Sequence, residues 1–220
     1  MDNSTRLQYL EAMGIDVWIP REAVHVTDNE PVIELYDDSW VELQGEVVSC
    51  KKCDLCTTRK QTVFGEGNID AEWMLIGQAP EQNEEMEGRP FVGQHGLLLT
   101  EMIRSIGLKR EDVYITNLLK CSPPEGRDPK VEEINTCYDY VSRQITLVKP
   151  KIILAIGRVA AQRLLNTKQP LSKLRGEAHQ LDGIPLVVVY HPAYLLRSLL
   201  EKRKAWQDLQ LAIKTKQEKQ

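Results

Sequence analysis

The sequence predicts an α/β protein whose parallel sheet is covered by helices. Four short apolar or β-rich runs lie along the chain, at residues 73–76, 112–116, 151–156 and 186–190, and helical stretches separate them. Runs of this length suit strands that are buried on both faces. Strands that alternate with helices are typical of a parallel sheet.

The composition is consistent with one globular domain and an appendage. The 220 residues are 42% apolar, which is enough for a full core. No apolar run approaches membrane-spanning length, and the first residues lack the features of a signal peptide, so a cytoplasmic location is expected. In that compartment, the five cysteines are expected to be metal ligands or free thiols rather than disulfides.

An acidic extension, residues 1–49, precedes a basic body. It holds eleven Asp and Glu against two Arg, a net charge of −9, so residues 50–220 carry +5 of the total of −4. A basic body is compatible with a polyanionic partner, although a solvated surface explains the charge more simply. The pattern predicts a helix at 5–13 and an apolar run at 17–20. Trp18 and Trp40 are expected to anchor the extension onto the body or to bind a protein partner.

Cys50 and Cys53 form a C-x-x-C pair that can hold one metal ion or one iron of a cluster. A closed site needs four ligands, and Cys56, Cys121 and Cys137 are the remaining candidates. Cys56 is close enough in sequence to crowd the pair, whereas Cys121 follows a predicted strand and Cys137 lies on a predicted helix. The predicted ligands are therefore Cys50, Cys53, Cys121 and Cys137. Unrelated buried cysteines are the alternative, as is Cys56 in place of one ligand.

The first predicted strand of the body lies at residues 73–76, and the other predicted elements follow it along the chain. That strand breaks at Gly77 into a loop that ends on the sequence GRPFVG at residues 88–93. Apolar residues at helical spacing predict helices at 94–107, 131–148, 158–165 and 202–213. The strand at 112–116 leads into a Pro- and Gly-rich loop at 120–129, and a polar tail follows from 214 to 220.

Three polar residues, Gln78, Asn117 and His191, each fall just past the end of a predicted strand. The carboxyl ends of parallel strands meet at one edge of a sheet, where such folds bind their ligands. The chain has no serine nucleophile elbow, no P-loop and no dinucleotide glycine pattern. The absence of these three motifs disfavours acyl transfer, NTP hydrolysis and hydride transfer as the reaction.

The residue types expected at this edge suit cleavage of a bond to a nucleobase. Asn117 can read the edge of an amide-bearing ring, and Phe91 offers a face on which that ring stacks. His191 can donate a hydrogen bond to a departing anion, helped by the backbone N–H groups of Gln78 and Ala79.

Glu84 or Glu85 can position or deprotonate a water molecule. Each residue also has a purely structural interpretation: Phe91 in the core, Asn117 capping a loop, His191 in a turn, and the glutamates on a solvated face. Their shared position at one edge favours the functional interpretation.

Eight motifs follow one another along the body of the chain: Cys50-x-x-Cys53-x-Leu55, Phe64-Gly65-Glu66-Gly67-Asn68, Gly77-Gln78-Ala79-Pro80, Gly88-Arg89-Pro90-Phe91-Val92-Gly93, Tyr114-Ile115-Thr116-Asn117, Lys120-Cys121-x-Pro123-Pro124, Cys137 and His191-Pro192-Ala193-Tyr194-Leu195-Leu196-Arg197. In these motifs and their order, the chain resembles the family 4 uracil-DNA glycosylases, which are the iron-sulfur type. The resemblance implies a three-layer α/β/α sandwich with a four-stranded parallel sheet at residues 50–213, and a monofunctional hydrolase that removes uracil from DNA.

The resemblance also implies roles for individual residues. A uracil flipped out of DNA would stack on Phe91 and be read by Asn117, while His191 stabilises the departing anion and Glu84 fills the family's acidic catalytic position.

Other roles concern DNA, the cofactor and the assembly. Leu195, Leu196 and Arg197 would enter the duplex or hold its backbone, and Gln78 and Ala79 would add main-chain contacts. The four predicted cysteines would carry a 4Fe-4S cluster, with zinc as the alternative. A monomer acting on DNA in the cytoplasm and nucleoid is expected, with residues 1–49 open to a protein partner.

Two positions depart from the family loop, which usually reads Gly-Glu-Ala-Pro-Gly. Gln78 replaces the glutamate and Glu81 replaces the final glycine. Glu81 is the larger change, because it adds bulk and negative charge beside a developing uracil anion. Two alternatives follow: a DNA- or partner-binding module with weak or no activity, and a glycosylase for another deaminated base.

Overall fold

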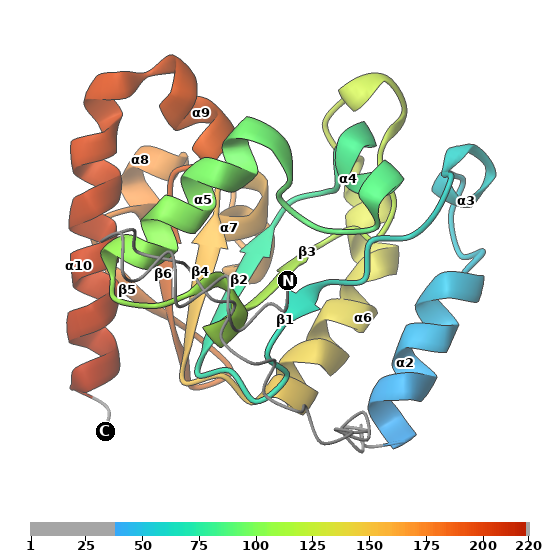
Figure 1. Cartoon of the computed structure of the whole chain (residues 1–220), viewed down its shortest axis with the longest axis horizontal. Coiled ribbons are helices and arrows are strands. Elements are labelled where there is room, and N and C mark those ends of the chain that lie inside the picture. Colours follow the sequence, from blue (N-terminus) through green and yellow to red (C-terminus); the bar gives the residue numbers. More distant parts are fainter. Residues whose placement is uncertain (1–37, 219–220) are drawn as a thin grey trace, which may run out of the picture. The chain divides into compact units, whose positions relative to one another are not determined.

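The computed structural model describes residues 38–218, which form a compact unit around one six-stranded sheet (Figure 1). The strands run in the order β1-β3-β2-β4-β6-β5. The four inner strands are parallel and match the four predicted runs, whereas β1 and β5 pair antiparallel at the two edges. The predicted count of four is thus corrected to six. The strands are β1 (Glu66–Gly67), β2 (Trp73–Gly77), β3 (Tyr114–Asn117), β4 (Ile152–Ile156), β5 (Ala178–Leu181) and β6 (Ile184–Val189).

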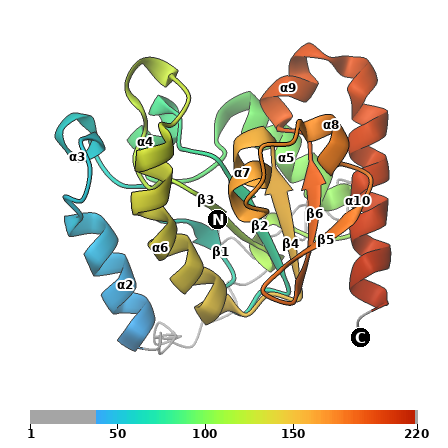
Figure 2. The ribbon, with the colours of Figure 1, turned by 180° about the vertical axis from the view of Figure 1, so that it is seen from behind.

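Nine α-helices in the described part of the chain surround this sheet (Figures 1 and 2). They are α2 (Asp38–Ser49), α3 (Leu55–Thr58), α4 (Gln82–Glu87), α5 (Gly93–Ser105), α6 (Val131–Val148), α7 (Arg158–Leu164), α8 (Leu171–Leu174), α9 (Pro192–Arg197) and α10 (Lys202–Gln217). Short 3-10 turns lie at Arg110–Asp112, Pro124–Gly126 and Leu199–Glu201. Within residues 38–218, no helix combines the length and the hydropathy of a membrane span.

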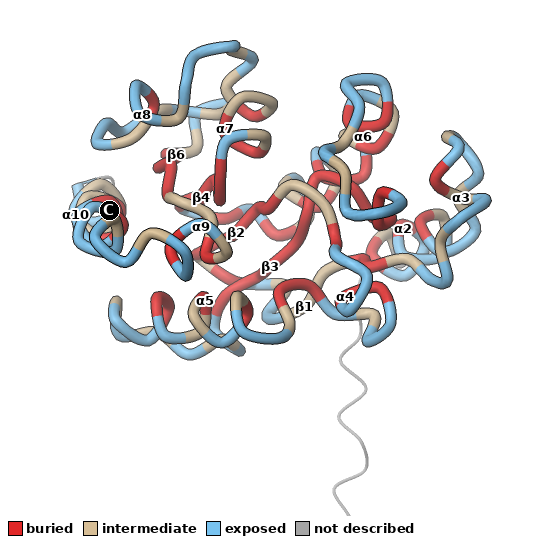
Figure 3. The backbone as a smooth tube through the Cα atoms, turned by 90° about the horizontal axis from the view of Figure 1, so that it is seen from above, coloured by how far each residue is buried: buried red, intermediate tan, exposed pale blue. Residues whose placement is uncertain are grey.

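Successive residues of each inner strand enter different cores, which produces the three predicted layers. Met74 and Ile76 of β2 belong to one core with α2, α6 and α7. Trp73 and Leu75 belong to the other core with α5, α9 and α10. Because both faces are covered, the inner strands are buried along their length, as Figure 3 shows from above. The α/β/α sandwich is confirmed.

Helix α2 belongs to the compact unit, although the sequence prediction assigned residues 1–49 to an extension. The unit begins at Asp37, and α2 lies beside α6 (Figure 2). Trp40 packs edge-on against the rings of Phe64 and Tyr114, with centroid distances of 5.3 and 5.4 Å. At the other end, α10 continues past the predicted limit at residue 213. The predictions for residues 5–13, for residues 17–20 and for Trp18 lie outside the described residues.

A buried polar cluster joins β3 to α6. Lys120 is 1% exposed, and its Nζ donates to Thr116 Oγ1 (2.6 Å), the Asn117 carbonyl (2.9 Å) and Gln144 Oε1 (2.7 Å). Gln144 Nε2 in turn donates to the Phe64 carbonyl and Tyr114 Oη. Burial lowers the pKa of Lys120 to about 7, and the nearby Cys137 and Cys121 oppose this shift.

We expect Gln144→Leu to lower the free energy of unfolding by about 2–4 kcal/mol, because it leaves the buried Lys120 and Tyr114 groups with fewer partners. Denaturant unfolding of the variant and the native chain measures this change. Gln162→Leu is the matched control, since Gln162 bonds to Gln169 at the surface of α7. Equal effects of the two substitutions would contradict the role of the buried cluster.

Candidate functional site

The carboxyl ends of β2, β3 and β6 meet at one edge of the sheet, and the residues that follow β2 and β6 line a cavity there. Gly77 pairs with Asn117 in the β2–β3 register, and His191 follows β6. The cavity measures about 490 Å³, and its wall includes Gln78, Ala79, Glu81, Glu84, Phe91 and His191. A neighbouring cavity of about 680 Å³ shares Gln78, Glu81 and His191 and adds His95, Leu196 and Arg197. The predicted edge residues therefore come together.

Phe91 occupies a strained backbone conformation that its surroundings hold. Its φ is +51°, in the left-handed region that non-glycine residues rarely adopt. Its N–H donates to Glu84 Oε1 at 2.8 Å, and Arg110 donates to the Pro90 carbonyl at 2.6 Å. A Cβ at Gly96 would lie 1.8 Å from the Phe91 carbonyl oxygen, so only glycine permits this close approach. A strained conformation that several contacts hold in place is typical of functional loops.

Asn117 and Phe91 meet beside Gly77. A Cβ built on Gly77 would lie 2.2 Å from Asn117 Oδ1 and 2.6 Å from Phe91 Cζ, so the missing side chain lets both groups approach the strand end. Asn117 is 2% exposed, and within the described part of the chain its Nδ2 has no hydrogen-bond partner. A buried donor without a partner is costly, and a ligand that accepts from it would remove that cost.

His191 is held as a neutral imidazole with one defined tautomer. Its Nδ1 accepts a hydrogen bond from the Ala193 N–H at 3.2 Å, which leaves the proton on Nε2. Burial, and then the positive charges of His95 and Arg197, lower the pKa of His191 to about 4. Its ring lies 5.6 Å from the Phe91 ring at an angle of 32°. The arrangement provides a neutral N–H donor next to an aromatic face.

Of the two candidates Glu84 and Glu85, Glu84 lines the cavity, but its carboxylate is already engaged. It is 2% exposed and accepts from the N–H groups of Phe91 (2.8 Å) and Glu81 (3.1 Å). Its Oε1 also lies 3.0 Å from His95 Nε2. These contacts suit a group that positions the loop, which differs from the expected role of activating water.

The backbone conformation at Glu81 does not require a glycine. It caps α4 with φ of −86°, an extended conformation that any residue adopts, and its side chain is 54% exposed. The substitution therefore leaves the backbone unstrained. What it changes is the charge on the wall of both cavities.

The structure corrects one predicted DNA contact. Leu195 is 1% exposed and packs into the core with α5 and α10, because the first turn of α9 turns it inward. Leu196 and Arg197 do reach the surface. Leu199 and Leu200, 64% and 92% exposed, are surface residues that the sequence analysis missed. The sequence feature that could have identified them is a pair of adjacent leucines that lies outside any apolar helical pattern. The basic residues Lys202, Arg203 and Lys204 come shortly after this pair.

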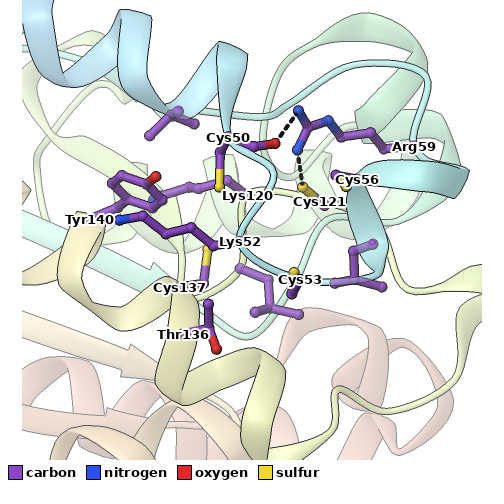
Figure 4. A pocket seen from close by; sticks show the side chains of 13 residues that line it. Cys50, Lys52, Cys53, Cys56, Arg59, Lys120, Cys121, Thr136, Cys137 and Tyr140 are labelled. Atoms are coloured by element: carbon purple, nitrogen blue, oxygen red, sulfur yellow. Dashed lines mark hydrogen bonds between the residues drawn. The ribbon is translucent and has the colours of Figure 1, made fainter.

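The cysteines gather at a second location, between α2, α3 and α6. Figure 4 shows Cys50, Cys53, Cys121 and Cys137 around one small cavity of about 10 Å³, which Cys56 also lines. Arg59 Nη1 donates to Cys121 Sγ at 3.2 Å and its Nη2 donates to the Cys50 carbonyl at 2.7 Å. Among residues 38–218, no three Cys, His, Asp or Glu side chains are close enough to hold one metal ion.

We expect Gly77→Ala to lower the free energy of unfolding by about 1–3 kcal/mol, because the added methyl overlaps Asn117 and Phe91. Gly45→Ala is the control. Gly45 lies within α2, where a Cβ meets nothing within 4 Å, so alanine should stabilise the helix by up to about 1 kcal/mol. Denaturant unfolding of both variants tests the opposite signs, and stabilisation by Gly77→Ala would contradict the close approach at the strand end.

Comparison with known proteins shows the family of the chain. Residues 64–210 match the family described as the uracil DNA glycosylase superfamily. The chain is 43% identical over 167 residues to the type-4 uracil-DNA glycosylase of Archaeoglobus fulgidus, covering 72% of this chain and 84% of that protein. It is 48% identical over 160 residues to the type-4 enzyme of Saccharolobus solfataricus, covering 69% and 74%. A type-5 enzyme of Pyrobaculum aerophilum is 25% identical over 193 residues. The chain therefore belongs to the uracil DNA glycosylase superfamily, within its type-4 group.

Proposed function

We propose that this protein hydrolyses the N-glycosidic bond of uracil in DNA and leaves an abasic site. The observation that carries the proposal is the convergence of an aromatic face, an unpartnered amide donor and a neutral imidazole donor at one sheet edge, supplied by Phe91, Asn117 and His191. The printed names of the type-4 relatives state the same activity for those proteins.

Recognition of the base depends on Phe91 and Asn117. The target nucleotide leaves the DNA stack, and its ring stacks on Phe91. Asn117 Nδ2 then donates to the uracil O4, and Oδ1 accepts from N3–H. Cytosine carries an amino donor where uracil carries O4, so two donors would face each other and cytosine would be rejected.

Bond cleavage depends on His191. As the bond from C1′ to N1 breaks, negative charge develops on uracil, and the Nε2–H of His191 donates to O2. Backbone N–H groups of Gln78 and Ala79 add to the polar wall. Water supplies a hydroxyl to C1′ and a proton to the released uracil. Glu84 holds Phe91 and the loop rather than the water.

DNA would meet the edge of the sheet beside α9. Leu196, Leu199 and Leu200 present apolar side chains, and Arg197 together with residues 202–204 supplies positive charge. Apolar side chains that replace a displaced base, with cations on the phosphates, are the expected chemistry for this task.

We propose that the four predicted cysteines hold a 4Fe-4S cluster rather than a single metal ion. The thiols of Cys50, Cys53, Cys121 and Cys137 surround one cavity, but no three of them are close enough for one metal ion among the described residues. A 4Fe-4S cluster needs its ligands more widely spaced than zinc does. When bound, it would act as a structural cross-link between the chain at Cys50, the loop at Cys121 and α6, while Arg59 offsets thiolate charge.

The function is tested on labelled uracil-containing single strands and U:G duplexes, with alkali to break abasic sites. His191→Ala should lower the rate of uracil release by about 100-fold or more, because the departing anion loses its donor. Iron content should stay unchanged. His179→Ala is the matched control, since its imidazole contacts the Leu174 carbonyl away from the cavity. An unchanged rate in His191→Ala would contradict the assignment.

The ligand set is tested by single Cys→Ala substitutions. Loss of Cys50, Cys53, Cys121 or Cys137 should reduce bound iron, acid-labile sulfide and soluble yield, because each thiolate closes the site. Cys56→Ala is the control and should retain all three. Iron retained in Cys137→Ala but lost in Cys56→Ala would reassign the fourth ligand.

A further inference from the structure

His95 lies on the wall of the second cavity, and neither the recognition of the base nor the cleavage of the bond uses it. It sits in the first turn of α5, with its side chain 12% exposed. Its Nε2 lies 3.0 Å from Glu84 Oε1, and its Nδ1 lies 3.8 Å from Glu81 Oε2. Its ring centroid is 6.3 Å from those of both Phe91 and His191.

The carboxylate of Glu81 is a problem for the proposed chemistry. It lies on the wall of both cavities that His191 lines. Negative charge at that wall repels the uracil anion that forms as the bond breaks. Its backbone is unstrained, so what has to be compensated is its charge.

We propose that His95 is a positioning residue, held as an imidazolium between Glu81 and Glu84, which neutralises the Glu81 carboxylate beside the departing uracil. This proposal rests on the proposed function. His95 acts through Glu81 and through the Glu84 loop that holds Phe91, so it needs no contact with the substrate.

The charge state follows from the surroundings of the ring. Both ring nitrogens face carboxylates, and a neutral imidazole has only one N–H. The hydrogen bond to Glu84 raises the pKa of His95, burial opposes this, and the charges of Glu81 and Glu84 add to it. The other charged or titratable groups around the same cavity are Asp128, His191, Tyr194 and Arg197. Burial, and then the charges of His95 and Arg197, lower the pKa of His191, so its ring stays neutral beside His95.

The ion pair can be measured without any enzymatic activity. The chain has four histidines, and the loss of one resonance in His95→Asn assigns His95 in an NMR titration of labelled imidazoles. The pKa of His95 should fall in Glu81→Gln, because a neutral amide no longer favours the imidazolium. An unchanged pKa would overturn the pairing.

Kinetics then test the consequence for catalysis. His95→Ala should lower the single-turnover rate of uracil release by about 10-fold, equivalent to ~1.4 kcal/mol at the barrier. In the Glu81→Gln background, the same substitution should cost less than about 3-fold, because the Glu81 carboxylate is gone and only the contact of His95 with Glu84 remains to be lost. Equal losses in both backgrounds would overturn the proposal. His179→Ala is again the control.

The pH dependence of the rate of uracil release is a further test, because a purely structural role of His95 would not change it. His95 carries its charge below its raised pKa, so the native rate should fall as pH rises through that value. This fall in rate at alkaline pH should be missing in Glu81→Gln and in His95→Ala. Its persistence in either variant would contradict the proposal. If the native chain releases no uracil, the proposed function fails, whereas the NMR titration still decides the ion pair.

Discussion

The buried carboxylate of Glu84 is the interaction on which the site depends. It joins the start of α4, the backbone of Phe91 and the first turn of α5 through Glu81, Phe91 and His95. Phe91 keeps a left-handed conformation that costs about 1–3 kcal/mol, because these contacts prevent it from relaxing. A charged acceptor of two backbone N–H groups is a strong anchor. The ring of Phe91 is therefore held in one position on the cavity wall.

The pKa values of two histidines of the site shift in opposite directions because their surroundings differ. His191 is half-buried beside positive charge and accepts from a backbone N–H, which favours the neutral ring and lowers its pKa. His95 lies between two carboxylates, which raise its pKa and favour the charged ring. The same residue type is thus biased toward opposite charge states at two walls of one site.

The cysteine cavity and the side-chain amide of Asn117 are connected through the end of β3. Cys121 lines the cavity, and the preceding Lys120 donates to the carbonyl of Asn117 and to Gln144 of α6. Lys120 is fully surrounded by acceptors rather than by solvent. Anything that ties Cys121 and Cys137 together therefore also steadies the strand end from which Asn117 projects.

The inner sheet was predictable, because continuous apolar runs indicate strands buried on both faces, and parallel strands bring their carboxyl ends to one edge. The edge strands were not, since β1 has two residues and β5 alternates exposed with half-buried positions. Sequence alone determined the fold class and which residue types reach the rim. Only the tertiary structure decided that Leu195 faces the core, that Glu84 is engaged and that His95 is paired, because each depends on contacts between separate elements.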